Sequence, residues 1–223
     1  WLVRPGMEKG ELKDTCINGS SEMVTNLSSG IITFLFNLAM MHFAGEDGVA
    51  AITIIQYSQF LLNALFMGFS QGVSPVISFN YGSRNQEQLR QVFKTSLLFT
   101  LATSAATFLL AQLGGSIVVG IFAEPGSPVY GLARHGFTIF AFSFLFSGFT
   151  IFASALFTAL SDGRISAVIS FVRTFGLIIT SLMVLPFLIG VDGVWLAIPI
   201  AELGGLLLSI HYMRKYRSTY HYA

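Results

Sequence analysis

The fold is decided by residues 17–43, INGSSEMVTNLSSGIITFLFNLAMMHF, a run of membrane-spanning length with one charged side chain, Glu22. Its polar side chains recur at steps of four, three, four and four residues, which is the spacing of one helix face. They are Glu22, Asn26, Ser29, Thr33 and Asn37. An ionisable group in hydrocarbon costs at least about 2.5 kcal/mol, so we expect Glu22 to face a cavity or the bundle interior and to have a function.

The composition excludes an ordinary soluble domain. The 223 residues are 53% hydrophobic and only 10% charged, against about 25% charged in soluble proteins, and the mean hydropathy is +0.70. Uncharged intervals of membrane-spanning length cover residues 23–45, 48–83, 95–123, 135–161 and 174–191, and a sixth span, 193–213, is broken only by Glu202. The sequence therefore predicts an all-α integral membrane protein, a bundle of six transmembrane helices.

The basic residues predict the topology. If the spans alternate, Arg134 lies alone on one side and Arg173 inside a span, while the other lysines and arginines share the opposite side. These are Arg4, Lys9, Lys13, Arg84, Arg90, Lys94, Arg164, Arg214, Lys215 and Arg217. By the positive-inside rule both termini are cytoplasmic in a multi-pass protein of the cell membrane. We expect a cytoplasmic linker at 1–13, the bundle at 14–216 and a cytoplasmic tail at 217–223.

The second span, 49–79, carries the amides Gln56, Gln59 and Asn63 at helical spacing. Such amides either bond a neighbouring helix, for about 0.6 kcal/mol on average, or line a substrate path, and the set together favours a polar cavity. Gly68 and Gly72 form a GxxxG pair that predicts close approach of another backbone.

The fourth span, 129–160, combines small hydroxyl residues with many phenylalanines. The hydroxyls are Ser143, Ser147, Thr150, Ser154, Thr158 and Ser161. Two interpretations stay open: close helix packing through the small residues, or a cavity wall whose phenylalanine rings hold an organic cation.

Two charges lie inside the last two spans. Arg173 lies 9 residues past Arg164, and Glu202 lies 12 residues before Arg214. At about 1.5 Å per residue their depths differ by only about 4 to 5 Å, so we expect a structural ion pair. Trp195 is expected to anchor its helix at the outer membrane interface.

One segment is diagnostic of a family: residues 67–94, MGFSQGVSPVISFNYGSRNQEQLRQVFK. Physically, Gly82 permits a turn and Asn85 can cap the next helix. The segment resembles the multidrug and toxic compound extrusion (MATE) family, in which a glycine-glutamine-glycine-proline pattern precedes an Asn-Tyr-Gly turn. The matching residues are Gln71, Gly72, Pro75, Asn80, Tyr81 and Gly82. GSSE at 19–22 and WLAIPIAE at 195–202 extend the resemblance over nearly the whole chain.

The resemblance implies twelve helices in two halves of six, with this chain as the second half. The partner would be the missing N-terminal half or a second copy, and residues 1–13 look like an opened linker. The implied function is an antiporter that exports lipophilic or cationic small molecules by alternating access, in exchange for protons or sodium ions. Cation coupling is assigned to Glu22 and Asn26. Substrate contacts are assigned to the cavity-lining residues Thr33, Asn37, Gln59, Asn63, Ser147, Thr150 and Ser154.

Proton coupling is the simpler expectation, because the sodium-coupled members carry an acid in the fourth span and none occurs here between Arg134 and Asp162. The alternatives are a flippase for lipid-linked oligosaccharides, whose cavity would be strongly cationic, and a non-transporting membrane scaffold. No metal site, cofactor, nucleic-acid partner or enzyme activity is expected, since His ligand spacing and the glycine motifs of ATPases and hydrolases are missing.

Overall fold

The structure, a computed structural model, describes the backbone of residues 9–223 and most of their side chains. The side chains of residues 9, 11–14, 17–18, 20–22 and 24–26 lie outside the description, which includes those of Glu22 and Asn26. The described part is almost entirely helical and contains no strand. Its elements are α1 (Lys9–Gly82), α2 (Gln86–Phe122), α3 (Pro128–Phe140), the 3-10 turn η1 (Ala141–Ser143), α4 (Phe144–Ala159), α5 (Gly163–Phe171), the π-helix η2 (Val172–Ile178), α6 (Ile179–Ile189) and α7 (Val191–Tyr220).

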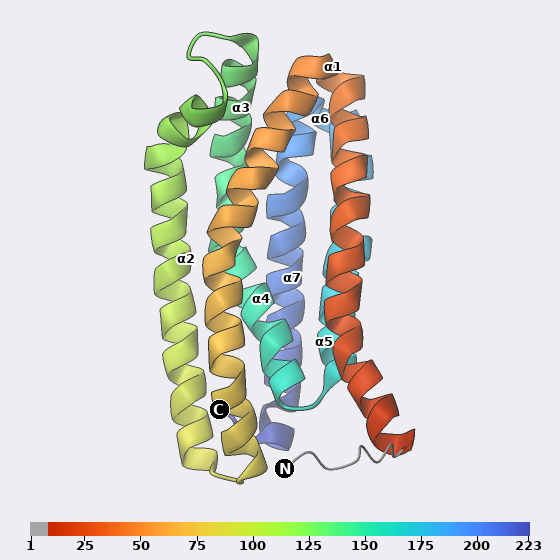
Figure 1. Cartoon of the computed structure of the whole chain (residues 1–223), viewed down its shortest axis with the longest axis vertical. Helices are drawn as coiled ribbons and strands as arrows, with labels where there is room; N and C mark the ends of the chain where they lie inside the picture. The colour runs from red at the N-terminus through yellow and green to blue at the C-terminus, as the bar shows by residue number, and fades with distance from the viewer. Residues whose placement is uncertain (1–8) are drawn as a thin grey trace, which may run out of the picture.

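The first two expected spans form the two arms of α1, which we call the first arm (residues 9–44) and the second arm (46–82). The chain reverses at Gly45, whose φ of 64° and ψ of −153° are not helical, and Figure 1 shows the arms descending from this turn. A Cβ at Gly48 would lie 2.5 Å from the Ala44 Cβ, so a second glycine permits the reversal. Within the described residues, five helices are long and apolar enough to cross a membrane. The break in the first of them gives the six predicted spans.

Side-chain caps fix the starts of α2 and α5. Asn85 Oδ1 accepts a hydrogen bond from the Gln88 backbone N–H at 3.2 Å, as the sequence predicted. α2 begins directly after this cap, at Gln86. Asp162 caps α5 in the same way, through Oδ1 and the Ile165 backbone N–H at 3.3 Å.

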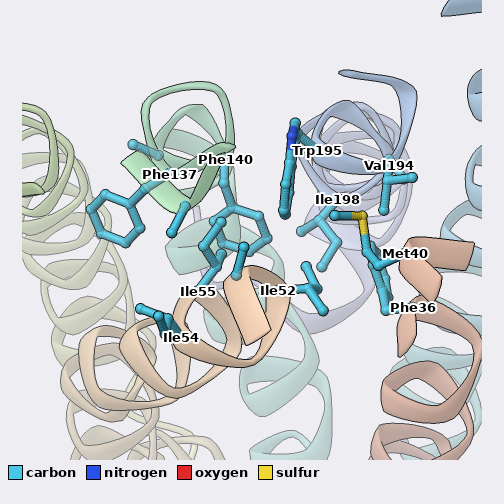
Figure 2. Packing of buried hydrophobic residues seen from close by; sticks show 14 of the residues in the cluster. Phe36, Met40, Ile52, Ile54, Ile55, Phe137, Phe140, Val194, Trp195 and Ile198 are labelled. Carbon is cyan, nitrogen blue, oxygen red and sulfur yellow. The ribbon is translucent and has the colours of Figure 1, made fainter. Parts of the chain in front are cut away.

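The main hydrophobic core joins both arms of α1 to α3 and α7. Figure 2 shows its members: Phe36, Met40, Ile52, Ile55, Phe137, Phe140, Val194, Trp195 and Ile198. Trp195 is fully buried, so its expected place at the membrane interface is wrong. Gly136 of α3 is the physical reason, because a Cβ there would lie 2.6 Å from the indole ring. A glycine opposite the ring lets α7 pack close enough to enclose it.

A second core lies at the end of the bundle where α2 begins. Phe93, Phe152 and Phe157 are buried in it together with Tyr222. α7 continues to Tyr220, and the Tyr222 hydroxyl donates to the Met213 carbonyl at 2.6 Å. Much of the segment expected as a cytoplasmic tail therefore belongs to the last helix and its packed end.

The expected close approach at the GxxxG pair does not occur within the described residues, where nothing lies within 4 Å of a Cβ added at Gly68 or Gly72. The close contact forms instead at Gly205 of α7. A Cβ there would lie 2.9 Å from Thr150 Cγ2 and 3.3 Å from Arg173 Cγ. This approach brings α4, η2 and α7 together around one polar site.

Candidate functional site: a polar cavity between the helices

A cavity of about 1450 Å³ opens inside the bundle. Its walls come from both arms of α1, from α4, from α5 with η2, and from α7. A space of this size exceeds the volume that a drug-sized ligand needs, about 300 to 1,000 Å³.

The first arm contributes the polar face that the sequence singled out. Thr33 and Asn37 line the cavity, as do Gly19 and Ser29. Asn37 Oδ1 is buried and, among the described residues, has no hydrogen-bond partner. A buried acceptor left unpaired costs about 1 to 3 kcal/mol, so this position suits water or a polar ligand.

The second arm adds amides and the aromatic surface of the cavity. Gln59 and Asn63 line it, together with Gln56. Tyr57 and Phe60 are the aromatic side chains among the described lining residues. Both project from the helix face that carries the amides.

α4 presents hydroxyls to the cavity, and its phenylalanines face elsewhere. Thr150, Ser154 and Thr158 line the cavity, whereas Phe144, Phe152 and Phe157 are fully buried in the hydrophobic cores. The idea that these phenylalanines contact an organic cation is therefore wrong for the cavity. The small hydroxyl residues face inward, and the bulky rings pack against α1, α2 and α7.

Ser147 occupies a different place from the one its spacing suggested. It is buried and does not line the cavity, but its hydroxyl donates to Asn63 Oδ1 at 3.4 Å. Asn63 does line the cavity, so Ser147 supports a wall residue from behind.

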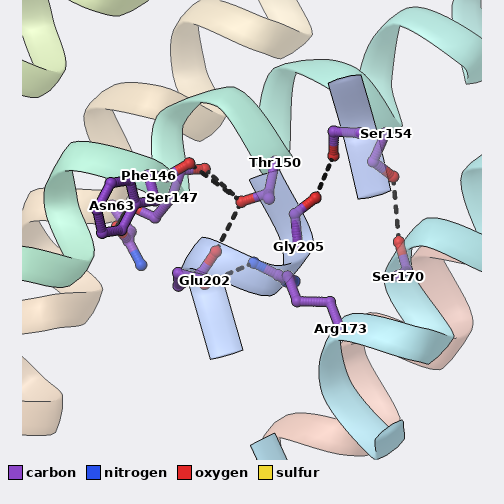
Figure 3. A network of polar contacts seen from close by, with 10 residues as sticks. Asn63, Phe146, Ser147, Thr150, Ser154, Ser170, Arg173, Glu202 and Gly205 are labelled. Atoms are coloured by element: carbon purple, nitrogen blue, oxygen red, sulfur yellow. Dashed lines mark hydrogen bonds and ion pairs between the residues drawn. The ribbon is translucent and has the colours of Figure 1, made fainter. Parts of the chain in front are cut away.

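Arg173 and Glu202 both line the cavity, and Figure 3 shows the contact between them. Arg173 Nη1 lies 3.0 Å from Glu202 Oε1, and the Thr150 hydroxyl donates to Glu202 Oε2 at 2.7 Å. The Glu202 side chain is 3% exposed and the Arg173 side chain 17% exposed. Both carboxylate oxygens of Glu202 thus have a hydrogen-bond partner, and Arg173 is the more exposed of the two charged side chains.

The backbone around Arg173 is unusual, because η2 is a π-helix. Such wide turns occur often at functional sites in helices. The sequence suggested the Arg173–Glu202 contact but missed Thr150 as the second partner of Glu202. The available signal was the position of Thr150 in the series of hydroxyl residues along the fourth span.

A cluster of hydroxyls joins α4 to α5 beside the ion pair. Ser154 Oγ lies 2.8 Å from Ser166 Oγ and 3.1 Å from Ser170 Oγ, and Thr158 donates to Ser166 at 2.9 Å. Sequence reasoning missed Ser166 and Ser170. Their separation by four residues, one helical turn, was the signal that could have found them.

The described wall offers little charge and no metal centre. Arg173 and Glu202 are the charged residues among the described ones that line the cavity. No group of three or more His, Cys, Asp or Glu side chains able to hold a metal ion occurs among the described residues.

Comparisons with known proteins agree on one family. The family model MatE matches residues 23–184. Probable multidrug resistance protein YoeA of Bacillus subtilis (strain 168) is 24% identical over 133 residues, or 58% of this chain and 29% of that protein. Multidrug export protein MepA of Staphylococcus saprophyticus is 22% identical over 174 residues, or 78% of this chain and 37% of that protein.

Solved structures share the fold. The crystal structure of MATE in complex with MaL6 aligns with a TM-score of 0.89 at 20% identity, over 98% of this chain and 49% of that chain. The outward-facing conformation of a multidrug resistance MATE family transporter of the MOP superfamily aligns with a TM-score of 0.89 at 20% identity, over 100% of this chain and 50% of that chain. The chain spans about half the length of these solved chains. Because the family model covers well over half of the 223 residues, the chain belongs to the MatE family.

Proposed function

We propose that this chain acts as the second six-helix lobe of an ion-coupled exporter that moves lipophilic or cationic small molecules by alternating access. The observation that carries the proposal is the cavity of about 1450 Å³, lined by polar and apolar side chains, in a helical bundle of the MatE family. The names of both matched relatives, for multidrug resistance and multidrug export, support the same class of cargo.

The cavity suits transport because its wall combines polar and apolar surface. Amides and hydroxyls from three directions face a space that a membrane scaffold has no reason to keep open, since polar groups in a bilayer are costly unless they are bonded or hydrated. Apolar side chains such as Phe60 and Ile151 lie beside them. A lipophilic compound with polar groups matches such a wall.

Glu22 and Asn26 are proposed as the coupling site. Gly19 and Ser29 line the cavity, and Glu22 follows Gly19 by three residues as Asn26 precedes Ser29 by three. This helical spacing predicts a shared face. A carboxylate can exchange a proton or bind a sodium ion. We favour the proton, because α4 offers hydroxyls and no carboxylate as further ligands.

Export then requires a second lobe, supplied by a preceding half of the same protein or by a second copy. Ion binding at Glu22 and substrate binding in the cavity would favour opposite-facing states, and this differential affinity converts an ion gradient into export. The placement of lysine and arginine supports cytoplasmic termini in a multi-pass protein of the cell membrane.

The test is ethidium transport by the protein as its gene encodes it, in everted membrane vesicles energised by a proton gradient or by a sodium gradient. Wild-type protein is expected to transport ethidium with one of the gradients. Glu22→Gln should abolish gradient-driven transport, because the amide neither releases a proton nor carries the charge that holds sodium. Glu46→Gln, which changes an exposed acid at the turn of α1, is the matched control and should transport normally.

Each result distinguishes the alternatives. If neither gradient drives ethidium transport, the exporter proposal is contradicted, and the flippase and the scaffold remain. Normal transport by Glu22→Gln would show that the coupling site lies elsewhere. The flippase receives no support from the described wall, because pyrophosphate recognition needs several cations and Arg173 is already paired with Glu202.

A further inference from the structure

A second arginine, Arg134, lies in a membrane-spanning helix and does not line the cavity. Arg134 is in α3, six residues beyond Pro128, at a depth of roughly 9 Å along the helix. The distribution of basic residues placed it alone on one side of the membrane. Its side chain lies between α3 and α2, where Nη1 donates to Thr138 Oγ1 at 2.7 Å and Nη2 to the Gln112 carbonyl at 3.4 Å.

This guanidinium has only neutral partners in the part of the chain that the structure describes. The contacts between basic and acidic side chains there join His135 to Asp192 and Arg173 to Glu202, and neither includes Arg134. An arginine keeps its charge at any physiological pH, and charges within a membrane span are normally paired. Arg134 therefore has no anionic partner among the described residues, although a charge within a membrane span is normally paired with one.

An apolar track leads from Arg134 towards the middle of the bundle. Phe142 follows Thr138 by four residues on one side, and Phe108 precedes Gln112 by four on the other. The two rings are in contact, with centroids 5.1 Å apart. Phe142 is 47% exposed, and Leu109, the residue after Phe108, is 55% exposed. A cation at one end and apolar surface below it match the shape of a phospholipid.

We propose that Arg134 binds the phosphate of an acidic phospholipid whose acyl chain lies along Phe108, Leu109 and Phe142. The contact from Nη2 to the Gln112 carbonyl is long, so the Nη2 group can also donate to a phosphate oxygen. Arginine suits this role because its donors match two phosphate oxygens at once. Gly115 makes room for the guanidinium itself, since a Cβ there would lie 2.9 Å from Arg134 Nη1.

The test uses photoactivatable phosphatidylglycerol and phosphatidylcholine that carry the same diazirine acyl chain. Each is incorporated into nanodiscs with the protein as its gene encodes it, and labelled peptides are mapped by mass spectrometry. In the wild type, phosphatidylglycerol should label residues 105–113 and 138–142 roughly fivefold more than phosphatidylcholine does, as expected for one basic side chain near the membrane surface. Excess inorganic phosphate should not reduce this labelling.

Variants assign the preference to Arg134. Arg134→Gln should lower phosphatidylglycerol labelling to the level of phosphatidylcholine, while Arg134→Lys should keep most of the preference. Arg164→Gln removes a positive charge at the opposite end of the bundle and should leave labelling at this site unchanged. Equal labelling by both lipids in the wild type, an unchanged preference in Arg134→Gln, or displacement by inorganic phosphate would each overturn the proposal. The wild-type comparison decides the matter even if a variant fails to fold.

Discussion

The ion pair of Arg173 and Glu202 makes the strongest quantitative prediction. Removing one partner of a buried pair costs about 3 to 5 kcal/mol, because the other charge is left without compensation. Glu202 is the more deeply buried partner, at 3% side-chain exposure. We therefore expect Arg173→Met to destabilise the fold by about 3 kcal/mol. Glu202→Gln should cost about 2 kcal/mol, since Arg173 keeps partial access to the cavity and the amide oxygen can still accept from Thr150.

The double variant separates an ion pair from ordinary packing. With both charges gone, neither is stranded, so Arg173→Met with Glu202→Gln should cost about 2 kcal/mol in total, which is a coupling energy of about 3 kcal/mol between the two sites. Reversible unfolding in mixed micelles of dodecyl sulfate measures all three variants, with Arg164→Met as the control at an exposed arginine. A coupling energy at or below about 0.6 kcal/mol, the average for a polar contact between membrane helices, would refute the reasoning.

Two further predictions concern packing and pH. Gly136→Ala should destabilise the bundle by about 1 to 3 kcal/mol, because the added Cβ would lie 2.6 Å from the Trp195 ring. The control is Gly68→Ala, at a position where the described structure leaves open space. In the same micelle unfolding assay it should be neutral or stabilising by up to about 1 kcal/mol. Equal changes in stability from Gly136→Ala and Gly68→Ala would contradict the close packing at Gly136. Burial raises the pKa of Tyr222 from 10.0 to about 12. Its phenol therefore stabilises the fold below about pH 10, and this contribution is lost as the pH rises through 12. Helix content followed by circular dichroism should fall less steeply over that range in Tyr222→Phe, and identical profiles would show that the pKa of Tyr222 is the same in the folded and unfolded states.

The helices themselves were predictable because their signals are local. Uncharged intervals of membrane length mark the spans, and Asn85 marks the start of α2 through the oxygen that accepts from the Gln88 N–H. The polar face of the first arm is also a local pattern. Helical spacing grouped Thr33 with Asn37, and both line the cavity.

What the sequence could not provide is the identity of the neighbour that each face meets. Trp195 is buried because Gly136, on a helix far away in the sequence, lies opposite its ring. The glycines at 68 and 72 looked suited to a close helix contact, yet α7 makes that contact through Gly205. Spacing shows which side chains share a face, but the partner of that face is decided by how all the helices pack.

The π-helix is a second feature without a local signal. η2 shifts the register of the helix at Arg173, which meets Glu202 while Glu202 also accepts from Thr150. Comparing residue depths along ideal helices suggested the contact between Arg173 and Glu202, but it could not predict the contact between Thr150 and Glu202. A three-way site needs three helices to be placed at once.

Photolabelling with ethidium monoazide tests the central claim most directly, because it asks where a transported cation lies. The protein as its gene encodes it is labelled in native membranes, with excess ethidium as competitor, and the modified residues are identified by mass spectrometry. The account predicts competable labelling of cavity walls, near Asn37, Asn63 and Ser154. Competable labelling confined to the exposed face of α2, around Leu113 and Ile117, with none on the cavity walls, would contradict it.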